Sequence, residues 1–365
     1  MIETGARLLL HVFPTFAVGG AQMRFAALAN AFGDRYRHIV LALDGDYACA
    51  QRIAPNLPVR YEAIDAPKQA TLGNVRRFRR RLRELTPDAL VTYNWGAIEW
   101  AMANVPRLAR HIHIEDGFGP EERAGQIRRR VLTRRLVLAR STVVLPSRNL
   151  WRIATDVWGL NPSRVHYVPN GIDLGRFAGP DRVPGDVPII GTVAGLRTEK
   201  NVSRLLRAFR QVAEAMPARL IIVGDGPERS ALATLSEQLG LARRVAFIGQ
   251  VDDPSPLYRQ FDIFALSSDT EQMPLSVIEA MACGLPVAAT NVGDVMAMVA
   301  EANRAFITPL DETLLAGAIR TLAGDGTLRS RLGAANKAKA TAEFDQATMI
   351  AVFEMLFDGH APAPA

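Results

Sequence analysis

The 365-residue chain has only two cysteines, Cys49 and Cys283, and they lie far apart in the sequence. Two distant thiols exclude a disulfide framework and a cysteine-based zinc site, and they fit a reduced, cytoplasmic setting. No 18-residue apolar stretch is free of charge, so a transmembrane helix is not expected. The opening segment, MIETGARLLLHVFP, has a short apolar run and contains Glu3, which favours a buried strand over a secretory signal.

The length and the charge distribution both indicate two parts. A chain of this length favours two domains of about 180 residues each. Residues 1–178 contain 26 Lys and Arg and 15 Asp and Glu, a net charge of +11, whereas residues 179–365 contain 17 and 22, a net charge of −5. This difference predicts different partners for the two halves, and an anionic membrane would suit the first.

Apolar runs alternate with helical patterns in both halves. This alternation predicts two doubly wound α/β domains of the Rossmann-like type, with parallel sheets that face a cleft. Strands are expected at residues 7–13, 38–43, 89–94, 111–116 and 142–147, and again at 187–195, 219–227, 245–251, 262–268 and 286–293. Helices are expected at residues 22–32, 75–85, 202–216, 276–284 and 344–358.

The boundary between the domains is expected in the segment RFAGPDRVPGDVP, which is rich in proline and glycine and has no periodicity. We therefore assign residues 1–178 to the first domain and residues 179–341 to the second. The last helix follows within residues 342–358. Residues 359–365, GHAPAPA, are expected to be a disordered tail.

Ligands of doubly wound domains bind where strands run into helices, so these loops contain the candidate residues. Gly19 and Gly20 precede the first helix and could bring backbone N–H groups to an anion, although a plain tight turn would also explain them. They do not match G-x-G-x-x-G, which argues against a nicotinamide-dependent dehydrogenase. Arg197 and Lys200 follow a predicted strand and could clamp a diphosphate, or could be two solvated surface cations.

Residues 267–290 contain another junction between a predicted strand, a loop and a helix, and this one carries two glutamates. Glu271 stands in a loop, and Glu279 lies about one turn inside the helix that follows. Glu279 could accept two hydrogen bonds from the diol of a ribose, or could be an exposed helix carboxylate. The N–H groups of Leu275 and Ser276 would face a phosphate at the start of this helix.

Several segments together resemble the retaining GT-B glycosyltransferases of the family 4-like group (glycosyl transferases group 1). The strongest is the E-x7-E motif, Glu271 to Glu279, followed by AMACGLPVAAT. The others, which follow the family's order along nearly the whole chain, are GGA (19–21), VPNGID (168–173), GTVAGLRTEKN (191–201), LIIVGDGPER (220–229) and VAFIGQVDD (245–253).

The resemblance implies a nucleoside-diphosphate-sugar donor bound by the second domain. Glu279 would hold the ribose hydroxyls, Glu271 would contact the donor sugar, and Arg197 with Lys200 would neutralise the leaving diphosphate. The remaining donor-binding positions would be Gly19, Gly20, Gly249, Pro274, Leu275 and Ser276. No metal and no cofactor is implied, and the last helix would cross back onto the first domain.

Two positions depart from the family pattern. Many relatives have an arginine where this chain has Gly195, and here the arginine stands at 197. Many relatives also have a histidine before a glycine in the central loop of the first domain, where this chain has Asp116 before Gly117. Asp116 could orient an acceptor or donor hydroxyl. The nearby His113 is expected to be a strand-interior residue, because side chains alternate along a strand.

The resemblance implies sugar transfer with retention, and we expect a glycan or lipid-linked acceptor in an envelope or surface polysaccharide pathway, with no nucleic-acid partner. Residues 75–85 would then place six arginines and the stripe of Val75, Phe78, Leu82 and Leu85 on anionic lipid, or would form an ordinary solvated helix whose stripe is buried. Two other functions fit a similar fold: a sugar-nucleotide epimerase, and a non-catalytic sugar-nucleotide or glycan-binding protein.

Overall fold

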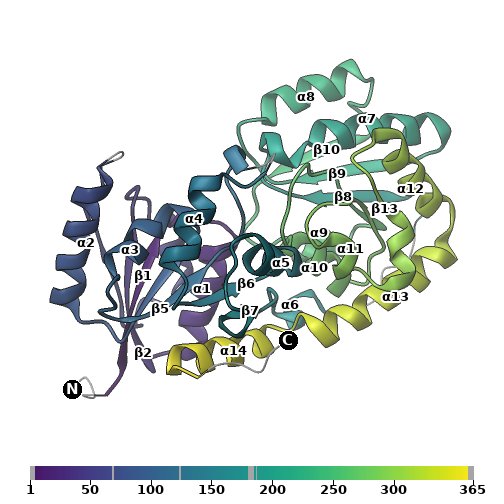
Figure 1. Ribbon diagram of the computed structural model, residues 1–365. Coiled ribbons are helices and arrows are strands. Elements are labelled where there is room, and N and C mark those ends of the chain that lie inside the picture. The colour runs from purple at the N-terminus through teal and green to yellow at the C-terminus, as the bar shows by residue number, and fades with distance from the viewer. Residues whose placement is uncertain (1–4, 68–69, 123–124, 180–184, 186, 361–365) are drawn as a thin grey trace. The chain divides into compact units, whose positions relative to one another are not determined.

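The computed structural model describes residues 5–67, 70–122, 125–179, 185 and 187–360. The chain divides into two compact units: residues 1–169 with residues 349–365, and residues 170–348. Each unit is a parallel sheet with helices packed on both faces (Figure 1). The predicted architecture of two doubly wound α/β domains is therefore confirmed.

The first unit contains a seven-stranded sheet in the order β3-β2-β1-β4-β5-β6-β7. The strands are β1 (Arg7–Phe13), β2 (Tyr36–Ala42), β3 (Val59–Glu62), β4 (Ala89–Tyr93), β5 (Arg110–Ile114), β6 (Thr142–Leu145) and β7 (Val165–Tyr167). Its helices are α1 (Gly20–Phe32), α2 (Thr71–Leu85), α3 (Ile98–Ala103), α4 (Arg128–Val137) and α5 (Arg148–Arg152), and most of α14 (Gln346–Asp358) belongs to it.

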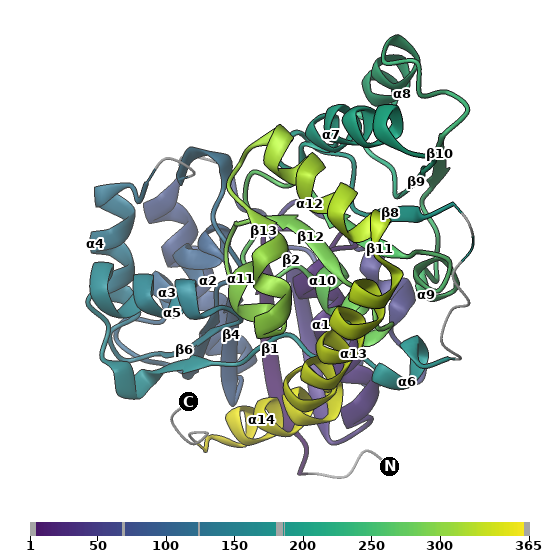
Figure 2. The ribbon, with the colours of Figure 1, turned by 90° about the vertical axis from the view of Figure 1, so that its right-hand side faces the viewer.

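The second unit contains a six-stranded sheet in the order β10-β9-β8-β11-β12-β13. The strands are β8 (Ile189–Val193), β9 (Arg219–Val223), β10 (Val245–Gly249), β11 (Ile263–Leu266), β12 (Val287–Thr290) and β13 (Ile307–Thr308). The helices are α6 (Leu174–Phe177), α7 (Val202–Ala215), α8 (Arg229–Gln238), α9 (Ser255–Tyr258), α10 (Leu275–Ala282), α11 (Val295–Met298), α12 (Glu312–Gly324) and α13 (Gly326–Glu343) (Figure 2).

Buried side chains on both faces of each sheet explain the continuous apolar runs of the strands. In β1, Leu9 and Phe13 pack on one face, and Leu10 and Val12 pack on the other. The helices bury one stripe each, as in α7, whose buried residues Val202, Leu205, Leu206, Phe209 and Val212 recur at helical spacing. Each sheet is thus enclosed between two helical layers.

The chain changes units earlier than the boundary expected after residue 178. Ile172 and Phe177 pack in the core of the second unit with α10, so α6 belongs to that unit. At the other end of the chain, Phe353 and Phe357 of α14 pack in the core of the first unit. The hydroxyl of Tyr36 donates to Asp358 at 2.9 Å and adds a polar contact to this packing. Of the expected disordered tail, residues 361–365 lie outside the described residues.

The apolar stripe of α2 is not available to a membrane. Phe78 and Leu82 are buried, and the ring of Phe78 stacks on Trp100 with centroids 4.6 Å apart. Arg77 and Arg81 form ion pairs with Asp65 and Glu62. The hypothesis that this stripe lies on lipid is therefore wrong, because the stripe is consumed by packing against α3 and the sheet. No helix in the described parts of the chain has the length and apolar character needed to cross a bilayer.

A close contact between backbones joins α13 to the end of α10. A Cβ added at Gly333 would lie 1.9 Å from the carbonyl oxygen of Gly284, whereas a Cβ at Gly317 of α12 would meet nothing within 4 Å. Both glycines lie inside helices. The two positions therefore offer a matched test of whether α13 must approach this closely.

We expect Gly333→Ala to destabilise the protein by about 1–3 kcal/mol, because the added methyl overpacks a backbone contact. Gly317→Ala should leave stability unchanged or raise it by up to about 1 kcal/mol, because alanine is the better helix residue. Urea unfolding of both variants and the wild type measures the difference. Equal stability of the two variants would contradict the contact.

Five histidines are buried in the strands of the first unit: His11, His38, His111, His113 and His166. Nε2 of His11 lies 3.0 Å from Nδ1 of His38, and the Thr92 hydroxyl lies 2.9 Å from His111 Nε2 and 2.8 Å from His113 Nδ1. Burial lowers the pKa of His38 to about 4 and lowers the pKa values of His111 and His113 to about 3. These imidazoles are therefore neutral in the folded protein at pH 7, as expected for the interior position assigned to His113.

This burial predicts a loss of stability in mild acid. The folded-state pKa values lie below the ordinary value, so the stability is fully present above about pH 6.5 and is lost as the pH falls toward 4. Each histidine contributes about 1.4 kcal/mol per pH unit within that window. Urea midpoints between pH 7.5 and pH 5 should show a shallower dependence in His113→Gln than in the control His360→Gln, whose ring is exposed. An identical pH dependence in both variants would overturn this prediction.

Candidate functional site

The strand order of the second unit fixes where a ligand can bind. Chain connections from β8 run outward through β9 and β10 on one side, and β11, β12 and β13 lie on the other side. The loops that follow β8 and β11 therefore separate at the carboxyl edge of the sheet, which is the usual ligand position in open α/β sheets. Lys200 lies in the first of these loops and Glu271 in the second.

Lys200 and Glu271 form an ion pair at this edge. The Nζ atom of Lys200 lies 2.6 Å from Oε1 of Glu271, and the Ser268 hydroxyl donates to the same oxygen at 2.8 Å. The side chains of Lys200 and Glu271 are 25% and 10% exposed, so the pair is largely shielded from water and Lys200 is the more accessible of the two. The structure thus brings together two of the predicted catalytic residues.

A network that the sequence did not reveal holds the Lys200 loop. Asn201 adopts the left-handed conformation at φ 42°, caps α7 and donates from Nδ2 to Asp269 at 3.1 Å. Arg204 forms an ion pair with the same Asp269 at 2.7 Å. The Ser267 hydroxyl donates to the Lys200 carbonyl at 3.1 Å. These contacts tie the loop after β8 to the loop after β11, so the Lys200 ammonium is held in place.

Glycines allow the loops at this edge to lie backbone against backbone. Gly224 has φ 125°, and a Cβ there would lie 1.9 Å from the Ala194 carbonyl oxygen. Gly293 has φ 54°, and a Cβ there would lie 2.3 Å from the carbonyl oxygen of Glu271. A side chain at either position would push apart the loops that contain Lys200 and Glu271.

Arg197 differs from Lys200. Its side chain is exposed, and among the described residues it forms no ion pair with Glu271 or Asp269. A Cβ at Gly195 would lie 3.7 Å from its Nε atom, so the guanidinium folds back over the position where relatives of the resembled family place their arginine. The predicted clamp therefore consists of one fixed cation and one exposed cation.

The start of α10 presents backbone donors beside Glu271. Pro274 is the N-cap and provides no side-chain hydrogen bond. The first N–H groups of the helix belong to Leu275 and Ser276, and such groups have no acceptor within their own helix. Together with the helix dipole, they favour an anion at this end. The predicted grouping of Pro274, Leu275 and Ser276 is thus adjacent to the Lys200–Glu271 pair.

Glu279 lies in the middle of α10 and is half-buried. The Tyr258 hydroxyl donates to its Oε2 atom at 2.7 Å. Burial raises the pKa of Glu279, and the hydrogen bond from Tyr258 opposes that change. Tyr258 is a further site residue that sequence reasoning missed, because nothing in the segment SPLYRQ distinguishes it from a core tyrosine.

Gly249 ends β10 on the same edge. It has φ 83°, and its carbonyl accepts a hydrogen bond from the N–H of Gly224 at 2.8 Å. This contact couples the end of β10 to the glycine-rich turn after β9. The structure therefore places Gly249 within the framework of the edge, with its backbone close to the other strand ends.

The first unit has a comparable edge. Gly19 is the N-cap of α1, in extended conformation at φ −163°, and Gly20 is the first residue of that helix. A Cβ at Gly19 would lie 2.7 Å from Oε1 of Gln22, whose Nε2 donates to the Thr15 carbonyl at 2.9 Å. Gly19 therefore leaves room for the side chain of Gln22, which bonds the preceding loop. Because Gly19 and Gly20 have no side chains, the backbone is uncovered by Cβ atoms at the start of α1.

Asp116 lies at the end of β5 and is held on two sides. The guanidinium of Arg24, from α1, contacts both carboxylate oxygens at 2.7 and 2.8 Å. The backbone N–H of Asp116 donates to Oδ1 of Asn94 at 2.7 Å. This bidentate pair fixes the orientation of the carboxylate. Arg24 was not anticipated from the sequence because it stands in an apolar helical pattern.

Asp116 also lines a cavity of about 440 Å³ in the first unit. The cavity is formed by the loops after β4 and β5 and by α4, with Asn94, Trp95, Phe118, Glu121 and Arg130 among the lining residues. Aromatic faces, carboxylates and a guanidinium are groups that bind hydroxyl-rich ligands. The neighbouring Glu115 is fully buried, and burial raises its pKa to about 8, although Arg134 opposes the change.

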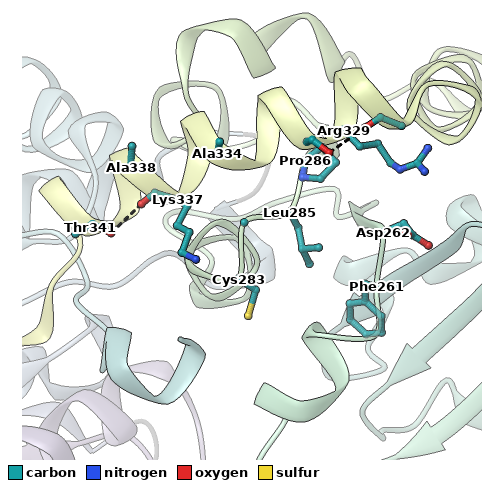
Figure 3. Close-up of a pocket in the computed structure, with 13 residues that line it drawn as sticks. Phe261, Asp262, Cys283, Leu285, Pro286, Arg329, Ala334, Lys337, Ala338 and Thr341 are labelled. Carbon is teal, nitrogen blue, oxygen red and sulfur yellow. Dashed lines mark hydrogen bonds between the residues drawn. The ribbon is translucent and has the colours of Figure 1, made fainter. Parts of the chain in front are cut away.

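A larger cavity of about 550 Å³ in the second unit lies away from these residues. Its lining includes Asp262, which precedes β11, and Pro286, which precedes β12, together with Lys337 of α13 (Figure 3). These positions are at the amino ends of the strands, so this cavity does not contain the predicted site residues. Within the described residues, no group of three or more His, Cys, Asp or Glu side chains could hold a metal ion.

Comparisons with known proteins identify relatives of both halves of the chain. Residues 179–339 match the model of glycosyl transferases group 1, and residues 18–176 match that of Glycosyltransferase Family 4. The chain is 30% identical over 233 residues to the putative glycosyltransferase EpsF of Bacillus subtilis, covering 58% of this chain and 60% of that protein. It is 27% identical over 166 residues to N-acetyl-alpha-D-glucosaminyl L-malate synthase of Bacillus anthracis, covering 45% and 44%. The matched stretch thus spans roughly half the length of these curated relatives.

Solved structures share the whole fold. Anabaena HepE in complex with UDP and glucose has a TM-score of 0.79 at 21% identity, covering 97% of this chain and 100% of that chain. Sucrose-phosphate synthase from Thermosynechococcus elongatus has a TM-score of 0.77 at 20% identity, covering 96% and 98%. With two parallel-sheet domains of this kind and a family model matching each of them, the chain belongs to the family 4-like glycosyltransferases (glycosyl transferases group 1) and has the GT-B fold.

Proposed function

We propose that this protein transfers a sugar from a nucleoside diphosphate to a hydroxyl of a glycan or lipid-linked acceptor, with retention of the anomeric configuration. The observation that carries the proposal is the fixed Lys200–Glu271 pair beside the open start of α10. A cation, a carboxylate and helix N–H groups at one edge suit a ligand that joins a diphosphate to a sugar. The structures of Anabaena HepE in complex with UDP and with UDP-glucose support a uridine nucleotide as the first donor to test.

The contacts described above support a proposed role for each of these residues. Lys200 and the N–H groups of Leu275 and Ser276 neutralise the diphosphate, and the exposed Arg197 closes over it. Glu271 binds hydroxyls of the donor sugar once the donor phosphate takes its place beside Lys200. Glu279, oriented by Tyr258, accepts hydrogen bonds from the ribose. The backbone near Gly249 borders the base.

The reaction breaks the bond between the anomeric carbon and the diphosphate oxygen, and forms a bond from that carbon to the acceptor oxygen. The acceptor proton passes to the leaving phosphate on the same face of the sugar. Stabilisation of the leaving charge is the main catalytic contribution, because preorganised donors act without reorganising in the transition state. This same-face route needs no carboxylate nucleophile, and it needs no metal or other cofactor.

The acceptor belongs in the cavity around Asp116. Arg24 holds this carboxylate in a fixed orientation, so it can accept a hydrogen bond from a hydroxyl of the acceptor. The aromatic face of Trp95 in the same cavity suits the apolar face of a sugar ring. We place the reaction in surface or envelope polysaccharide biosynthesis at the inner face of the cytoplasmic membrane.

Two other functions make different demands on the same site. An epimerase would change the donor when no acceptor is present, and a binding protein would leave the donor intact under all conditions. The cavity at Asp116 favours transfer, because an epimerase has no need for a second binding site for hydroxyl-rich ligands. Incubation of a panel of nucleotide sugars with and without an acceptor separates the three.

We expect Lys200→Ala to lower the rate of sugar transfer or donor hydrolysis by roughly 100-fold or more, because a preorganised charge is lost from the transition state. Donor affinity should fall less. Lys339→Ala is the control, since Lys339 also pairs with a glutamate, Glu343, at 3.9 Å on a distant helix. Arg197→Ala should show the smaller defect of the two clamp residues. A Lys200→Ala protein with wild-type turnover would refute the assignment.

Activity should persist in excess chelator. The protein's own cations and helix N–H groups neutralise the diphosphate in the proposed mechanism, so EDTA should change the transfer rate by less than about twofold, far below the effect of removing a preorganised donor. The measurement is turnover before and after dialysis against EDTA, then with magnesium or manganese added. Activity that disappears with EDTA and returns with the metal would show that the clamp has been misassigned.

A further inference from the structure

Helix α4 buries charged side chains and exposes apolar ones, the reverse of a typical surface helix. It buries two arginines, Arg130 at 9% exposure and Arg134 at 0%, and it exposes two leucines, Leu132 at 57% and Leu136 at 67%. Leucines normally occupy the inner face of a helix, and arginines are almost never fully buried unless they are paired. The helix lies on the outside of the first unit, near α3 and α5 (Figure 2).

The buried arginines explain the orientation of the helix. Arg134 makes a two-pronged contact with Glu122, at 3.0 Å for each nitrogen–oxygen pair. Its guanidinium also lies 4.7 Å from the ring centroid of Trp158 and 4.9 Å from that of Trp95. Rotating α4 to bury its leucines would expose this ion pair and leave Glu122 unpaired in the interior, which is strongly unfavourable. The leucines are therefore held outward.

The outward face combines apolar and cationic side chains. Leu132 and Leu136 are one helical turn apart, and Arg128, Arg129 and Arg135 surround them. All three arginines are exposed, and none forms an ion pair with an acid in the described parts of the chain. Val157, 49% exposed, belongs to the same side, since a Cβ at the nearby Gly159 would lie 3.6 Å from Nε of Arg135.

We infer that this outward face of α4, defined by Arg128, Arg129, Leu132, Arg135 and Leu136, docks on an anionic lipid bilayer. Leucines on an interfacial helix enter the boundary between headgroups and acyl chains, and arginines bind the phosphates. Charge complementarity selects the partner: the face has three unpaired guanidinium groups and no acid. A second copy of the same face would bring these charges together, which disfavours self-association.

The position of the face suits a membrane-bound substrate. Arg130, on the inward side of the same helix, lines the cavity that contains Asp116. A bilayer at the outward face would therefore bring a lipid-linked hydroxyl close to that cavity. Delivery of a lipid-linked acceptor to the cavity rests on the proposed function. Binding of α4 to lipid needs neither donor nor acceptor, so the lipid-binding inference and the proposed function can be refuted separately.

The test is sedimentation with vesicles of neutral and anionic phospholipid, without nucleotide sugar. The wild type should bind anionic vesicles, and Leu132→Glu with Leu136→Glu should reduce the partition coefficient at least tenfold. The matched control is Leu310→Glu with Leu314→Glu, which makes the same charge change at two leucines that are each 50% exposed in the second unit. This control should bind like the wild type, and all proteins should show the same melting temperature.

Charge and apolar contributions are separated by a second variant, Leu132→Ser with Leu136→Ser, which keeps every arginine. It should bind less than the wild type at every salt concentration. Equal binding by the wild type and both leucine variants, or no binding of the wild type to anionic vesicles, would overturn the inference. Loss of a wild-type dimer in the leucine variants, seen by size-exclusion chromatography, would also overturn it by showing that a second copy covers the face.

Discussion

The candidate donor site depends on one topological constraint, the reversal of strand order between β8 and β11. Parallel strands deliver all their following loops to one edge of a sheet, and the reversal separates two neighbouring loops there. Lys200 and Glu271 come from these two loops and meet at 2.6 Å, although 71 residues separate them in the chain. The glycines at 224 and 293 and the network around Asp269 serve the same end, because they let the loops lie close and hold the lysine still.

The sequence predicted the principal candidate residues at this edge of the sheet, but it did not predict the residues that hold candidate site residues in place. Strands such as β1 and β4 have continuous apolar runs, and residues Lys200, Glu271 and Glu279 stand in segments whose spacing resembles a known family. Tyr258 and Arg24 carry no such signal, because a tyrosine in a short helix or an arginine in an apolar helix has many ordinary explanations. Their roles come from tertiary contacts with Glu279 and Asp116 that only the fold creates.

The sequence located the basic helices of the first half but did not show which of their faces are buried. Periodicity correctly identified α2 as amphipathic, but an apolar stripe does not say whether it faces a core or a membrane. Burial of Phe78 and Leu82 answers that question in favour of the core. In α4 the arginines occur at most helical angles, so the sequence defines no face. The ion pair of Arg134 with Glu122, inside a ring of aromatic side chains, breaks the ambiguity by choosing which side of the helix is inward.

Burying an ion pair between arginine and glutamate costs free energy, because two charges are removed from water. Only good geometry between the two charged groups offsets this cost. Replacing such a pair with apolar residues is often neutral or stabilising, so stability alone does not account for Arg134. What the pair does provide is orientation: with Arg134 and Arg130 inward, Leu132 and Leu136 must point outward, and Arg130 must line the cavity at Asp116. One helix thereby connects the face that we infer to bind lipid with the cavity at Asp116. In a transferase whose acceptor is anchored in a bilayer, that connection is a functional reason to retain the buried charges.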